Sequence, residues 1–154
     1  MGNIASLGFG KRNALLAIGV GGLIAGAFDM TTALITFGRG VPRAIAGGLL
    51  GRDALQGGTG TYILGFLLHF FIAFSAAAVY YAVSRRLRFL TEHALVCGMF
   101  FGIAIYLVMN LIVLPLSALH ASRPIAIPAE IQGLLVHMIL IGLPISFSVR
   151  RFAR

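Results

Sequence analysis

The sequence is poor in charge. Only 10% of its 154 residues are Asp, Glu, Lys or Arg, and only four of these are acidic, whereas a soluble domain has about a quarter charged residues. Apolar residues make up 59% of the chain. A soluble protein with this composition could not cover its surface with groups that water solvates. The scarcity of charge therefore excludes an ordinary soluble domain and predicts a chain that is covered by lipid.

Cysteine and catalytic motifs are equally scarce. The single cysteine, Cys97, lies in an apolar run, so an intrachain disulfide and a Cys-x-x-Cys site are both excluded. No phosphate-binding loop, dinucleotide fingerprint or nucleophile with a matching base is present. We therefore expect no enzymatic activity.

Four stretches are long and apolar enough to cross the hydrocarbon core, which takes about 20 helical residues. They cover residues 14–37, 61–84, 94–114 and 131–149. Pro115 predicts the end of the third helix, and Pro144 predicts a kink in the fourth. The expected fold is all-α: one domain over residues 1–154, built as a bundle of four transmembrane helices.

The basic residues predict the orientation of this bundle. The net charge is +8, and the positive side chains cluster between long uncharged stretches. One side of a four-span protein would hold eight of them: Lys11, Arg12, Arg85, Arg86, Arg88, Arg150, Arg151 and Arg154. The other side would hold four, which are Arg39, Arg43, Arg52 and Arg123. The positive-inside rule then places both termini in the cytoplasm. No basic groove with interleaved aromatics is present, so we expect the bilayer, and not nucleic acid, as the partner.

The first outer loop, residues 38–60, carries a periodic pattern of its own. Val41, Ile45 and Leu49 recur every four residues, which fits a short helix lying in the membrane interface. The glycines at 47, 48 and 51 weaken such a helix, so an ordered loop is the alternative.

Glycines are also spaced within the spans. Gly22 and Gly26 are four residues apart in the first span, and Gly98 and Gly102 in the third. Small residues at this spacing let membrane helices approach closely. We expect these four to be packing positions within the chain, or else a face for a second copy or another subunit.

Ionisable and polar residues inside a membrane are costly and are therefore candidate site residues. Asp29, His69 and His137 lie in the first, second and fourth spans, Asn110 lies in the third, and Glu130 opens the fourth. His69 follows the expected outer end of its helix by about seven residues, as does His137, which places both roughly 10 Å below the outer surface. We therefore expect all five residues in the outer half of the bundle.

Three kinds of role fit such a cluster. The polar groups could fix helix packing by hydrogen bonding to one another. They could bind or pass a proton, an ion or a small polar solute, because histidine titrates near neutral pH. His69 and His137 could also ligate a divalent metal or a haem, although no cofactor is predicted specifically. We expect the second role, which makes the chain a binding or transport protein. The alternative is that the chain is an accessory or assembly subunit of a larger membrane complex.

Several short segments resemble the YagU-like family of bacterial inner-membrane proteins, whose function is unknown. The segments are residues 22–26, His69 with Tyr80 eleven residues later, Gly98 and Gly102 leading to Pro115, residues 130–133, and the closing Arg150 and Arg151. The resemblance implies a multi-pass protein of the bacterial inner membrane and supplies no activity. This chain departs from the family in its reduced outer loops and in Asn110, where the family pattern has a histidine. That departure removes one expected ligand from a shared metal or haem role.

Overall fold

The computed structural model describes residues 3–120 and 127–152, and the fold is all-helical over these ranges. In chain order the elements are α1 (Asn3–Phe37), α2 (Val41–Leu50), η1 (Arg52–Gln56), α3 (Thr59–Ser84), α4 (Phe89–Glu92), α5 (Ala94–Val108), η2 (Met109–Val113), α6 (Leu114–Leu116), α7 (Ile127–Val136), η3 (His137–Gly142) and α8 (Leu143–Phe152). Of these, η1 is a 3₁₀ turn, whereas η2 and η3 are π-helical.

Four continuous helices are long and apolar enough to cross a membrane. They cover Arg12–Phe37, Thr59–Ser84, Ala94–Leu116 and Ile127–Phe152. The prediction of four long apolar helices is therefore confirmed. The first two predicted spans end at the observed residues, and the last is longer than predicted at both ends. The chain is compatible with a multi-pass membrane protein.

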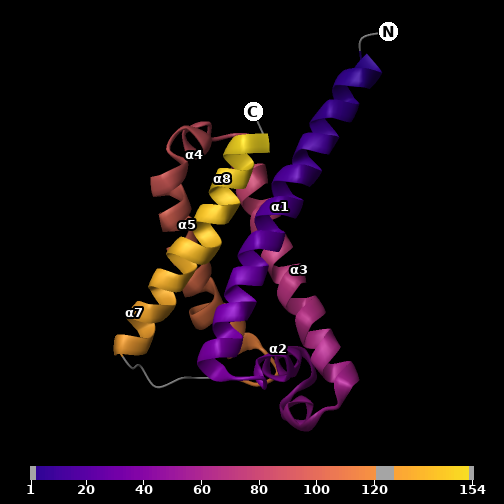
Figure 1. Ribbon diagram of the computed structural model, residues 1–154, viewed down its shortest axis with the longest axis vertical. Helices are drawn as coiled ribbons and strands as arrows, with labels where there is room; N and C mark the ends of the chain where they lie inside the picture. Colours follow the sequence, from indigo (N-terminus) through magenta and orange to yellow (C-terminus); the bar gives the residue numbers. More distant parts are fainter. Residues whose placement is uncertain (1–2, 121–126, 153–154) are drawn as a thin grey trace.

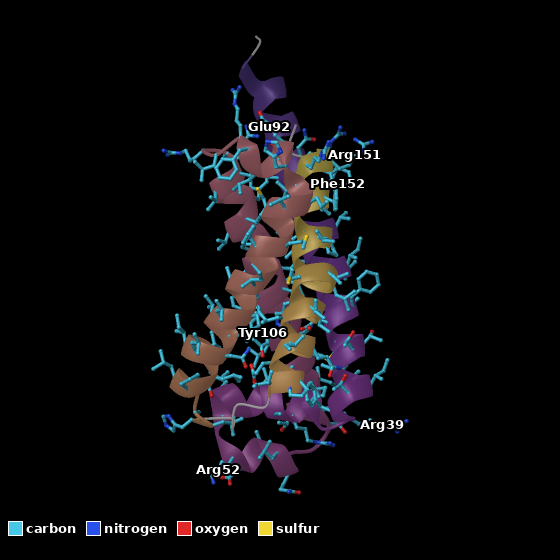
Figure 2. The ribbon with its side chains drawn as sticks, turned by 90° about the vertical axis from the view of Figure 1, so that its left-hand side faces the viewer. Arg39, Arg52, Glu92, Tyr106, Arg151 and Phe152 are labelled. Atoms are coloured by element: carbon cyan, nitrogen blue, oxygen red, sulfur yellow. The ribbon has the colours of Figure 1, made fainter. Side chains whose placement is uncertain are left out.

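Both chain termini lie at one end of the bundle, and α2 lies at the other (Figure 1). We call these the terminal end and the loop end. Figure 2 shows Glu92 and Arg151 at the terminal end and Arg39 and Arg52 at the loop end, with Tyr106 in the span between them. Charged groups thus lie at the two ends of the bundle, as a membrane-spanning chain requires.

The first loop forms a helix, α2, which decides between the two expected alternatives. Its buried face consists of Pro42, Ala46 and Gly47, whereas Leu49 is 62% exposed. The apolar residues that recur every four positions, Val41, Ile45 and Leu49, thus lie beside the buried face of α2 and not on it. The reason is tertiary packing: the Pro42 carbonyl lies against Gly65 of α3, where a Cβ could not fit. The turn that ends α2 requires glycine, because Gly51 has a φ of 86°.

A buried core joins the first, second and fourth spans. Its buried side chains come from α1, α3, η3 and α8: Ala17, Ala25, Ala76, Ala77, Tyr80, Ile141, Ile145 and Val149. The hydroxyl of Ser148 donates a buried hydrogen bond to the carbonyl of Ala17 at 2.9 Å, which ties α8 to α1. In contrast, α3 and α5 make almost no backbone contact with each other. The last span is therefore joined closely to α1, whereas the backbones of α3 and α5 stay apart.

The four glycines expected at packing positions all lie at helix contacts. A Cβ on Gly22 or Gly26 would collide with Phe74 or Phe70 of α3. On the opposite side of the bundle, Gly98 and Gly102 of α5 lie against the backbone of η3. These positions bring α1 onto α3 and α5 onto the last span, because only glycine lets the backbones approach so closely.

Two of the spans contain a π-helical segment just before a proline. η2 ends two residues before Pro115, and η3 ends two residues before Pro144. A proline ring in a helix collides with the carbonyl four residues earlier, and here those carbonyls belong to Leu111 and Leu140, inside the π segments. A wider turn at that point relieves the collision. The third helix accordingly continues through Pro115 to Leu116, so the predicted end at residue 114 is wrong.

The contact of α5 with η3 gives a test of the packing. In Gly142→Ala, the new methyl group would collide with the carbonyl of Gly98, so we expect a loss of about 1–3 kcal/mol in stability from overpacking. Gly19→Ala is the matched control, because nothing lies within 4 Å of a Cβ at Gly19. The thermal unfolding midpoint in a mild detergent measures both variants. Equal midpoints would contradict the close contact.

Candidate functional site

The first polar pair joins α1 to α3. The Nε2 of His69 lies 2.9 Å from the carbonyl oxygen of Gly26. Because a carbonyl only accepts, Nε2 carries the proton and donates. The same nitrogen is 4.0 Å from the Oδ2 of Asp29, too far for a hydrogen bond and close enough for an electrostatic contact. The two side chains are 12% and 23% exposed respectively, so both are largely removed from the surface.

The second polar group joins α5 to the last span through Tyr106. The hydroxyl of Tyr106 donates a short hydrogen bond to a carboxylate oxygen of Glu130. The ring of Tyr106 meets the ring of His137 edge to face, with centroids 5.1 Å apart. Gly133 lies between Glu130 and His137 on the last span, and a Cβ at Gly133 would collide with the ring of Tyr106. Glu130, Gly133 and His137 therefore form one face of the last span on which Tyr106 rests.

Asn110 and His137 lie in the two π segments. The side-chain amide of Asn110 donates to the Tyr106 carbonyl at 2.9 Å, on its own span. The Nδ1 of His137 lies 2.9 Å from the carbonyl of Gly133, also on its own span. π-helical turns expose backbone and shift side chains relative to an α-helix, and they occur often at functional sites.

Asp29 lines two cavities of the bundle. The first measures about 340 Å³ and lies between α1, α2, α3 and η2; its polar lining residues are Asp29, His69, Ser117 and His137. The second measures about 280 Å³ and is more polar. It lies between the last turns of α1, the third span and the start of the fourth, and its polar lining residues are Asp29, Thr32, Thr36, Tyr106, Asn110, Gln132 and His137. Asp29, Leu114 and His137 line both cavities, so the two spaces meet at an acid and a histidine.

The five predicted site residues are thus arranged in two groups. Asp29 and His69 form a pair, whereas Glu130 reaches the site through its bond to Tyr106. His137 lies between the groups, and Asn110 lines the second cavity. The residue that sequence reasoning missed is Tyr106. A tyrosine in the middle of a span, away from the interface that tyrosines prefer, was the available signal.

A metal centre receives no complete ligand set from the described residues. Over residues 3–120 and 127–152, no three His, Cys, Asp or Glu side chains are grouped so as to hold one ion. Protein metal sites usually take three or four such ligands. Ligation of a haem by His69 and His137 stays a prediction, which an absorption spectrum of the purified protein would test.

Comparison of the chain with protein-family models, with curated proteins and with solved structures finds no match. The resemblance to the YagU-like family therefore stays a prediction, and the argument on function rests on the site itself.

The bond from Tyr106 to Glu130 can be tested by removing one hydroxyl. We expect Tyr106→Phe to lower stability by about 0.5–2 kcal/mol, as for other side-chain hydrogen bonds between membrane helices. Tyr62→Phe is the control: the Tyr62 ring lies under the guanidinium of Arg43, and its hydroxyl bonds nothing within the described part of the chain. Thermal unfolding in a mild detergent measures both variants. A Tyr106→Phe midpoint equal to that of the control would mean that the bond contributes nothing.

Proposed function

We propose that the protein is a non-enzymatic membrane protein that binds or passes a proton, an ion or a small solute at Asp29. The observation that carries this proposal is that Asp29 and His137 line both cavities. A carboxylate away from the bilayer surface is costly, so a chain with few acidic residues keeps one there mainly for function.

The arrangement of the two cavities suggests a route. The second cavity is lined by Thr36 and Phe37 at the end of α1 and by Ala129 and Gln132 at the start of α7, so it lies near the loop end. Its polar lining suits water and small polar solutes. The first cavity extends from α2 at the loop end along α3 as far as Ala76, and His69 lies beside the same acid there. In this proposal a proton or solute enters from the loop end and reaches the Asp29–His69 pair.

We further propose that the loop end faces outward and that both termini face the cytoplasm of a bacterial cell. The excess of basic residues on the terminal side supports the orientation. The bacterial inner membrane rests on the resemblance to the YagU-like proteins. Under this orientation the cavities open away from the cytoplasm.

Proton movement in proteoliposomes tests the function. With an imposed pH gradient and a pH-sensitive dye inside, the native chain should speed equilibration, whereas Asp29→Asn and His69→Gln should lose most of this effect because each removes one of the two side chains that carry the proposed pathway. Asp53→Asn is the matched control, since Asp53 is an exposed acid in η1, outside the cavities. Repeating the assay with inorganic cations in place of the proton gradient covers ion movement.

The outcomes of this assay are separable. The native chain, Asp29→Asn and empty vesicles are compared with protons and with cations. If all three give equal rates with both, the proposal that the protein is a pathway is contradicted. Sizing the particle in mild detergent addresses the alternative of an accessory subunit. Other chains that copurify at fixed ratio would favour that alternative, and a lone monomer or homo-oligomer would count against it.

Cysteine labelling tests the orientation. In a Cys97→Ala background, Gln56→Cys places a thiol at the loop end and Leu87→Cys places one between α3 and α4; both positions are exposed and the charge is unchanged. A membrane-impermeant maleimide added to intact cells should label Gln56→Cys at once and Leu87→Cys only after lysis. The reverse pattern would invert the proposed topology.

A further inference from the structure

The first cavity is lined by one acid and two histidines, and by neither lysine nor arginine. Among the described residues that surround it, Asp29 is the only Asp or Glu, and neither Lys nor Arg reaches the space. An ionised carboxylate only accepts hydrogen bonds. No hydrogen bond within the described residues satisfies Asp29, so its oxygens are open to a donor in the cavity.

The other polar side chains of this cavity have already used their donors. The imidazole of His69 donates from Nε2 to the Gly26 carbonyl, and that of His137 donates from Nδ1 to the Gly133 carbonyl. The hydroxyl of Ser117 donates to the Leu114 carbonyl at 2.7 Å. In a neutral imidazole the second nitrogen is an acceptor, and a hydroxyl oxygen keeps its lone pairs. The polar groups of the cavity therefore offer acceptors to a ligand and no donor.

The remaining lining is apolar and comes from all four long helices and from α2. It includes Ile45 and Leu49 of α2, Leu68 and Ile72 of α3, and Met109 of η2. A volume of about 340 Å³ lies at the small end of the range for pockets that hold organic molecules, which is about 300–1,000 Å³. The space therefore suits a compact molecule with an apolar body.

Other ligand classes fit these walls less well. An anion would meet the carboxylate of Asp29 without a compensating donor. A Ca²⁺ or Mg²⁺ ion needs about six oxygen ligands, whereas this cavity offers one carboxylate among apolar side chains. A neutral alcohol could donate one hydrogen bond but would leave the charge unpaired. An ammonium group supplies both the donors and the opposite charge.

We propose that this cavity binds a compact amphipathic organic ammonium ion, with its nitrogen at Asp29 and its apolar body between α2, α3 and η2. This proposal rests on the proposed function and names the ligand class of the same site. His69 and His137 lie at the same cavity, where their acceptor nitrogens can share the protons of the ammonium head.

Three probes of nearly equal shape test the head group. Naphthylmethylammonium, naphthylmethanol and naphthoate share one apolar body and carry a positive, a neutral and a negative head. Equilibrium dialysis against the full chain in nanodiscs of zwitterionic lipid, with empty nanodiscs as the blank, measures binding. We expect the ammonium probe to bind at least about tenfold more tightly than the alcohol, and the carboxylate to bind weakest, because one ion pair forms in a poorly solvated space.

Two variants locate the binding. Asp29→Asn should lower the affinity for the ammonium probe to that of the alcohol, whereas Asp53→Asn should leave it unchanged. Ala44→Phe adds a ring to the cavity wall on an exposed position of α2, without changing charge, and should weaken the ammonium and alcohol probes together. The thermal unfolding midpoint of each variant is measured first, and only variants with a midpoint close to that of the native chain are compared. Asp29→Asn must also still bind the alcohol probe, which shows that its cavity is folded.

Equal binding of the ammonium and alcohol probes, or full ammonium affinity in Asp29→Asn, would overturn this inference. The proposed function can survive that result, since Asp29-dependent proton or cation movement in vesicles would still stand. Conversely, selective ammonium binding without any movement would support a binding protein and would contradict a pathway.

Discussion

The close approach of α5 to the last span determines much of this architecture. Gly98 and Gly142 lie so near each other that neither tolerates a side chain. In a membrane, helices gain little by burying apolar surface against one another, so contacts of this kind supply much of the packing energy. Because the contact fixes the third span against the fourth, and Gly22 fixes the first against the second, the backbones of α3 and α5 are left without a close approach of their own. The cavities occupy the space that results.

The two prolines explain why polar residues lie at this space. Each one forces the turn before it to widen, and the widened turns contain Asn110 and His137. In a regular α-helix each carbonyl would accept a hydrogen bond from the N–H four residues later, and the side chains would keep the spacing of 3.6 residues per turn. The π segment shifts the register by one residue, so the residues before and after it face different neighbours. Pro144 thus influences where His137 points, although the proline itself contacts neither cavity.

The sequence predicted the spans well and the rotation of the helices poorly. Span length follows from hydropathy and bilayer thickness, so ends such as Phe37 and Ser84 could be read directly. Depth is a residue count multiplied by the rise, which is why Asp29 and His69 were correctly expected at one level. Rotation about each axis depends on tertiary contacts, such as that of Pro42 with α3, which leave no periodic signal. Tyr106 was missed because a tyrosine hydroxyl is less costly to bury than a carboxylate, and no sequence pattern places it opposite Glu130.

The position of Asp29 is favourable for a group that must exchange its partner. A carboxylate surrounded by apolar side chains would resist ionisation, and one fully in water would bind a cation weakly. Asp29 lies between these limits, with a polar cavity on one side, an apolar cavity on the other and the imidazole of His69 4.0 Å away. In the proposed function, water in the polar cavity would stabilise the charge of the empty site, and a cation in the apolar cavity would gain from the poorer screening there. A proton would then replace the cation from the polar side, so the proposed binding and release at one acid would require no large rearrangement of the bundle.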